Sequence, residues 1–104
     1  MTGERLPDGF RLIAGALSLP EQKALMSAIQ DAIASAPLFQ PRMPRSGRPF
    51  SVRMTNCGPL GWVSDKERGY RYQPVHLETG RPWPPIPETL LELWRTYARV
   101  QGLP

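Results

Sequence analysis

The sequence predicts an α+β fold in which two helices pack around a small, irregular antiparallel sheet with hairpins extending from it. Apolar residues recur at helical spacing near both ends of the chain, whereas short alternating runs separated by turn residues occupy the middle. Thirteen prolines and nine glycines among 104 residues require much turn and extended structure. A chain of this length is at most one domain, with a thin core.

Residues 1–37 are expected to form a polar arm, a short strand and the first helix. The strand is predicted at Phe10–Ala14, which lies between two glycines. Ser18–Glu21 is a capping box with a proline in the first helical turn. We therefore predict a helix over 19–35, ended by Pro37, whose apolar stripe packs on the sheet. The stripe consists of Leu25, Ile29, Ala32, Ile33 and Ala36.

Residues 38–72 are expected to form an arginine-rich loop followed by strands. The loop is rich in proline and has little helix or strand potential. Phe50–Thr55 alternates between apolar and polar residues and is the best-supported strand of the sequence. Gly61–Val63 and Tyr70–Tyr72 are shorter strands, joined through a charged turn at Asp65–Gly69.

Residues 73–86 hold four of the prolines and are expected to be an extended connector. A second helix is predicted over 87–102, with Gly102 as its C-terminal cap. Its apolar stripe consists of Leu90, Leu93, Trp94, Tyr97 and Val100.

Positive charge is concentrated in the middle of the chain. The net charge is +4, and eleven of the thirteen basic residues are arginine. No acidic residue occurs between Ala32 and Ser64, a stretch that contains Arg42, Arg45, Arg48 and Arg53. Arginine binds phosphate through a rigid two-pronged guanidinium and stacks on flat rings, so this bias favours a nucleic-acid partner.

Aromatic residues lie among these arginines, with Arg68 and Arg71 close to Trp62, Tyr70 and Tyr72. Basic groups that bind phosphates together with rings that stack on bases are typical of single-strand recognition. Trp62, in a glycine-flanked turn, is a candidate for an exposed stacking residue. The alternative is that Trp62 belongs to the core and that the arginines form a solvated face.

The sequence holds too few ligands for a metal site. His76 and Glu78 have the spacing of an iron-binding pair, but such a site also needs a second histidine. His76 is the only histidine in the sequence, so we expect it to be a solvent-facing loop residue. Cys57 is the only cysteine, which excludes an internal disulfide and a thiolate metal site and suits the reducing cytoplasm. We expect Cys57 to be a small buried residue without a catalytic role. No signal peptide or membrane-spanning segment is expected.

The segment Met-Thr-Asn-Cys-Gly-Pro-Leu-Gly-Trp at residues 54–62 resembles a segment of the AlkB family of alkylated-base repair dioxygenases. The resemblance continues through Gly-Tyr-Arg-Tyr at 69–72 and Thr-Gly-Arg-Pro-Trp-Pro at 79–84. It covers residues 9–104, and a nine-residue string with one free position is a specific signal.

The resemblance implies an enzyme that depends on iron(II) and 2-oxoglutarate and hydroxylates N-alkyl groups on DNA or RNA bases, which then lose formaldehyde. It implies that this part of the enzyme forms a nucleotide-recognition lid over a double-stranded β-helix that holds the iron. Trp62 matches the lid tryptophan that stacks on the flipped base, Tyr70 a tyrosine that hydrogen-bonds near its phosphate, and Met54 an apolar residue of the base pocket. The candidates for phosphate contacts are Arg45, Arg48, Arg53 and Arg71.

The family's ligands for iron and 2-oxoglutarate lie beyond the end of this sequence. We therefore expect residues 1–104 to be a single partial domain, the substrate-recognition part, with no catalytic or metal-binding residue and no activity by itself. Its expected partners are alkylated DNA, RNA as a second possibility, and the catalytic β-helix. Two alternatives stay open: a nucleic-acid-binding module without catalysis, and an interaction protein that pairs through its helices.

Overall fold

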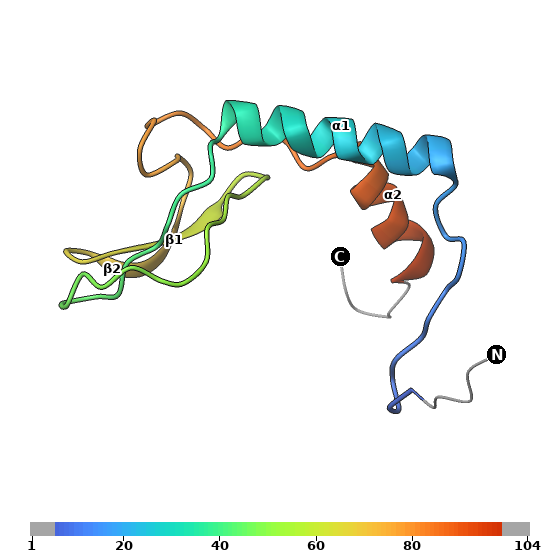
Figure 1. Ribbon diagram of the computed structural model, residues 1–104, viewed down its shortest axis with the longest axis horizontal. Helices are drawn as coiled ribbons and strands as arrows, with labels where there is room; N and C mark the ends of the chain where they lie inside the picture. The colour runs from blue at the N-terminus through green and yellow to red at the C-terminus, as the bar shows by residue number, and fades with distance from the viewer. Residues whose placement is uncertain (1–5, 99–104) are drawn as a thin grey trace.

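The chain forms an open arch with a β-hairpin near one end and a short helix near the other (Figure 1). The computed structural model describes residues 6–98. In chain order the elements are α1 (Leu19–Ser35), β1 (Gly61–Asp65), β2 (Gly69–Gln73) and α2 (Glu88–Tyr97), which confirms the predicted α+β class. The radius of gyration is 17.1 Å, whereas a compact domain of about 100 residues measures about 13 Å. The elements therefore do not close around one central core.

Helix α1 has the predicted bounds because strong local signals mark both of its ends. The Ser18 hydroxyl accepts a hydrogen bond from the Glu21 backbone at 3.3 Å, and the Glu21 carboxylate accepts one from the Ser18 backbone at 2.8 Å. Pro37 follows the last turn. The predicted stripe does not pack along its whole length: Ala32 in the helix and Ala36 just after it are buried, whereas Ile29 is exposed. Only the C-terminal end of α1 reaches the core.

Strands β1 and β2 form an antiparallel hairpin, as predicted for residues 61–72. Trp62 pairs with Tyr72 and Ser64 with Tyr70. Residues that pair across such a ladder point to the same face, so these four side chains share one face of the hairpin. Val63 and Arg71 share the other face. The hairpin thus separates an aromatic face from a face that carries a core residue.

The predicted strands at Phe10–Ala14 and Phe50–Thr55 are both absent. Residues 10–14 are exposed and irregular, since no neighbouring strand pairs with them. In the second segment only Met54 forms a bridge, through two 2.8 Å backbone hydrogen bonds with Phe39. Pro41 follows soon after Phe39, and a proline has no N–H to continue such pairing. Residues 39–55 therefore follow the edge of β1 as an extended loop.

A small core joins the end of α1 to the hairpin. It consists of Ala36, Phe39, Val63 and Trp83, with Met54 and Leu77 packed against it. The indole N–H of Trp83 donates to the Gln73 carbonyl at 2.8 Å, so the connector folds back onto β2. We call this core, the hairpin and residues 39–55 the hairpin lobe.

Helix α2 ends earlier than predicted and lies outside the core. It covers Glu88–Tyr97 instead of 87–102. The backbone N–H of Ala98 caps the helix by donating to the Trp94 carbonyl. The expected cap, Gly102, lies outside the described residues. None of its residues is buried. Within residues 6–98 no helix is long and apolar enough to cross a bilayer.

Candidate nucleic-acid interface

Trp62 lies on the aromatic face of the hairpin and stacks on Tyr70. Their ring centroids are 5.8 Å apart with an angle of 25° between the planes. The ring of Phe50 meets Trp62 edge-on at 5.9 Å. Trp62 is half-buried, whereas Tyr70 is 56% and Tyr72 is 69% exposed. The neighbouring Val63, and not Trp62, enters the core. The face therefore offers partly open flat rings to solvent.

The side chain of Asn56 fixes the backbone at Trp62. Its amide nitrogen donates to the Trp62 carbonyl at 3.0 Å, and its amide oxygen accepts from the Trp62 N–H at 3.2 Å. Asn56 thus occupies the place that a neighbouring strand would take beside β1. This paired contact limits how the indole can turn, and the sequence did not single out Asn56 as a site residue.

Met54 lies on the inner side of the same loop. Its backbone is bridged to Phe39, and its side chain is half-buried and packs against the core. The structure therefore anchors the predicted pocket residue to the core that supports the hairpin.

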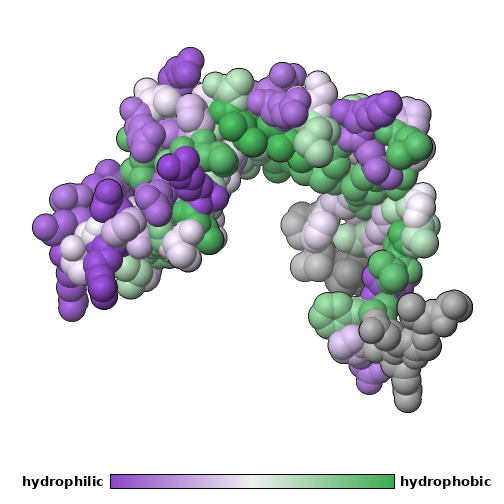
Figure 2. Space-filling model, viewed as in Figure 1, coloured by the Kyte–Doolittle hydropathy of each residue, from purple (hydrophilic) through white to green (hydrophobic). Residues whose placement is uncertain are grey.

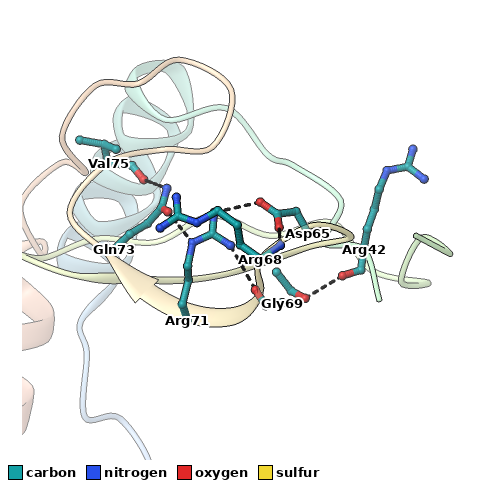
Figure 3. Close-up of polar contacts among 8 residues, drawn as sticks. Arg42, Asp65, Arg68, Gly69, Arg71, Gln73 and Val75 are labelled. Atoms are coloured by element: carbon teal, nitrogen blue, oxygen red, sulfur yellow. Dashed lines mark hydrogen bonds and ion pairs between the residues drawn. The ribbon is translucent and has the colours of Figure 1, made fainter. Parts of the chain in front are cut away.

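The guanidinium group of Arg71 binds other residues of the hairpin (Figure 3). Its Nη2 forms a 2.9 Å ion pair with Asp65, its Nε donates to the Gln73 side chain at 2.9 Å, and its Nη1 donates to the Gly69 carbonyl at 3.1 Å. The Arg71 hydrogen bond, followed by one from the Arg68 backbone, lowers the pKa of Asp65 below its ordinary value. Arg71 lies on the face opposite Tyr70, so the structure does not bring this predicted phosphate ligand together with the aromatic pair.

The other predicted phosphate ligands are exposed. Arg45 and Arg48 lie in the turn that follows Met43, and Arg53 lies beyond it on the extended loop. The ion pairs found within residues 6–98 do not involve these three arginines. Their guanidinium groups therefore keep their hydrogen-bonding capacity for a partner.

His76 is buried and structural, so the expectation of a solvent-facing residue is wrong. Its side chain is 1% exposed and packs between the rings of Phe39 and Trp83. Nε2 lies 2.7 Å from the Pro37 carbonyl, and Nδ1 accepts from the backbone N–H groups of Glu78 at 3.0 Å and Thr79 at 3.3 Å. A carbonyl only accepts and an N–H only donates, so the proton resides on Nε2. Three backbone partners offset the burial of the ring.

Cys57 is half-buried, whereas the sequence predicted a buried residue. Burial raises the pKa of its thiol, which keeps the group protonated and a weak nucleophile at neutral pH.

Comparison with known proteins identifies the family. The model of the 2OG-Fe(II) oxygenase superfamily matches residues 9–104. The chain belongs to this superfamily. Over 86 residues it is 48% identical to the alpha-ketoglutarate-dependent dioxygenase AlkB homolog of Caulobacter vibrioides (strain NA1000). The matched region covers 83% of the chain and 38% of the relative. The AlkB protein of Escherichia coli (strain K12) is 38% identical over 80 residues, covering 77% of the chain and 36% of the relative.

A third relative extends the same pattern. The AlkB protein of Salmonella typhimurium (strain LT2) is 35% identical over 82 residues, covering 77% of the chain and 38% of the relative. The chain thus spans little more than a third of the length of the curated relatives it matches.

The described part of this superfamily member does not fit the iron that gives the superfamily its name. Among residues 6–98, no three histidine, cysteine or acidic side chains lie close enough together to hold a metal ion. His76 already uses both ring nitrogens on backbone groups.

Proposed function

We propose that this chain is the substrate-recognition part of an AlkB-type dioxygenase that repairs N-alkylated bases in DNA or RNA. The observation that carries the proposal is the stacked, partly open pair of Trp62 and Tyr70 on the hairpin. A base that an enzyme modifies must leave the duplex stack, and it needs a flat partner outside it. An alkylated base that carries a positive charge gains further attraction from the electron-rich indole.

The surrounding residues support this role. Arg45, Arg48 and Arg53 are exposed cations that bind the backbone of the strand, and the Tyr70 hydroxyl bonds near the phosphate of the target nucleotide. Met54 closes the inner side of the base site, where it is anchored to the core. We assign Arg71 a positioning role instead of a phosphate contact, because its donors hold the hairpin together.

The rest of the whole enzyme, a catalytic β-helix, would pack against the helices. Figure 2 shows hydrophobic residues gathered along the inner side of the arch beneath α1. Several large apolar side chains of the helices are exposed: Met26, Ile29, Leu90, Trp94 and Tyr97. The iron and 2-oxoglutarate chemistry belongs to that β-helix, while this chain grips and orients the base. A cytoplasmic location accompanies this proposal.

Fluorescence anisotropy with the 104-residue chain tests the base-stacking role. The probes are a single-stranded oligonucleotide with one 1-methyladenine and its unmodified counterpart. We expect the chain to prefer the methylated strand, and Trp62→Ala to weaken binding by about 1–3 kcal/mol, the range for loss of a stacking aromatic. Trp94→Ala, which removes an exposed tryptophan from α2, is the matched control. Equal affinities for both variants and the unsubstituted chain would reject the proposal.

A further inference from the structure

The side chain of Met43 contacts the aromatic face of the hairpin at Tyr70. The Tyr70 hydroxyl donates to the Met43 sulfur at 3.9 Å, a long contact of the kind that a thioether accepts. Met43 is 39% and Tyr70 is 56% exposed, so solvent reaches both partners. The hydroxyl to which we assign the phosphate of the target nucleotide therefore has a methionine as its partner within the chain.

The backbone on both sides of Met43 is tied to β1 and the turn that follows it. The N–H of Arg42 donates to the Ser64 carbonyl at 3.0 Å, and the Ser64 hydroxyl donates back to the Arg42 carbonyl at 2.6 Å. Two residues after Met43, the N–H of Arg45 donates to the Lys66 carbonyl at 3.1 Å. Met43 is therefore held beside the hairpin by the fold, and its contact with the aromatic face does not depend on a loose loop.

A thioether suits a hydroxyl that must change partners. Because sulfur is a weak acceptor, it orients the Tyr70 hydroxyl in the free chain and still releases it to a phosphate oxygen, which is charged and binds more strongly. Oxidation of the sulfur changes this balance. Methionine sulfoxide is polar and carries an oxygen in place of the weak acceptor, so it competes with the phosphate for the same hydroxyl hydrogen.

We propose that Met43 is an oxidation site that regulates how Tyr70 binds nucleic acid. This inference rests on the proposed function and adds regulation to it. The oxidant is hydrogen peroxide, which transfers one oxygen atom to the sulfur. The O–O bond breaks and an S–O bond forms, the sulfur loses two electrons, and the other oxygen leaves as water with both peroxide protons. Reductases of methionine sulfoxide reverse the change.

The two other methionines among residues 6–98 have different surroundings. Met26 is 58% exposed but lies in the middle of α1, away from the hairpin. Met54 packs against the core, where oxidation would disturb packing and not the Tyr70 hydroxyl. Within this part of the chain, Met43 is the methionine whose exposed sulfur contacts a hydroxyl of the candidate interface.

Peroxide treatment of the 104-residue chain tests the site, with fluorescence anisotropy on the methylated and unmodified strands. We expect oxidation to weaken binding of both strands by about tenfold, the effect of losing one hydrogen bond to a charged group. Peptide mass spectrometry should find the added oxygen on Met43, and methionine sulfoxide reductase should restore the affinity. Met43→Leu is the matched control, because it keeps Met26, Met54 and Cys57 and should resist the loss on oxidation.

Tyr70→Phe separates an effect on the hydroxyl from a general structural effect. In that variant the hydroxyl is absent, so oxidation of Met43 should no longer change the affinity, whereas structural damage would persist. Losses on oxidation as large in Met43→Leu or in Tyr70→Phe as in the natural chain would overturn the proposal, as would a Met43 that peroxide does not oxidise.

The proposed function fails in a different way. An untreated chain without preference for the methylated strand would reject base stacking at Trp62. An oxidation-dependent loss shared by both strands, absent from Met43→Leu, would still support the Met43 site. A chain that binds neither strand would overturn both proposals.

Discussion

The indole of Trp83 lies so close to the Cα of Gly61 that no side chain fits between them. A Cβ at position 61 would come within 2.4 Å of Cε2 and 2.5 Å of Nε1 of that ring. The close approach lets Trp83 cover the start of β1 while its N–H reaches the Gln73 carbonyl on β2. Gly61 is therefore required for space, and the core beneath the aromatic face depends on it.

Gly61→Ala should destabilise the chain by about 1–3 kcal/mol, because an overpacked core must shift to admit the methyl group. The loss would appear as a lower midpoint of urea unfolding followed by tryptophan fluorescence. Gly80→Ala is the matched control: Gly80 has φ +70° and open space around it, so only backbone strain acts there. If Gly80→Ala proved more harmful than Gly61→Ala, the close packing against Trp83 would not be what matters.

Asn56→Ala should lower stability by about 1–3 kcal/mol, because it leaves the partly buried N–H and carbonyl of Trp62 without their side-chain partners. Binding to the methylated strand should weaken as well, since the indole is no longer held. Urea unfolding and near-ultraviolet circular dichroism would measure both changes. Asn56→Asp is the comparison, because a carboxylate still accepts from the N–H but cannot donate to the carbonyl. An unaltered aromatic signal in Asn56→Ala would show that Asn56 does not orient Trp62.

His76→Ala should destabilise the chain by about 3 kcal/mol or more, because three buried backbone groups lose their partners and the core loses a ring. Chemical denaturation would measure the loss. Glu78→Gln in the same turn changes a neighbouring exposed side chain and should have little effect. Comparable stability of the two variants would contradict the structural role of His76.

Acid should weaken the hairpin through Asp65. Its pKa is lowered in the folded chain, so the ion pair with Arg71 contributes stability above the unfolded pKa of about 3.9, and that contribution is lost as pH falls through the lowered folded value. Urea midpoints measured from about pH 6 down to about pH 2 should therefore fall more steeply for the natural chain than for Asp65→Asn. Parallel curves for the two proteins would show that this pair does not link folding to protonation.

Local signals in the sequence predicted the elements that depend on local contacts. The capping box at Ser18 and the proline after Ala36 fixed both ends of α1, and the charged turn after Asp65 fixed the hairpin. The strand predicted at 50–55 failed because regular pairing needs a continuous partner, and Pro41 interrupts the segment that faces it. Alternation alone could not reveal that interruption.

The sequence likewise predicted only part of the candidate site. The resemblance pointed to Trp62, and the structure places that residue on a partly open face. The burial of His76 depends on the carbonyl of Pro37, thirty-nine residues earlier in the chain. The closing of two turns through Arg45 and Lys66 is equally remote in sequence. Contacts between distant segments carry no signal in residue spacing, so these features required the fold.

The position of α2 outside the core has a consequence for deuterium exchange. Because none of its residues is buried and the core cluster comes from other segments, its amides should open locally at low free energy. Amides of β1, paired with β2 and adjoining the buried Val63, should be protected until the lobe itself unfolds. The chain would then behave as two cooperative units, α2 and the hairpin lobe. The exchange rate of the α2 amides would therefore not report the free energy of unfolding of the hairpin.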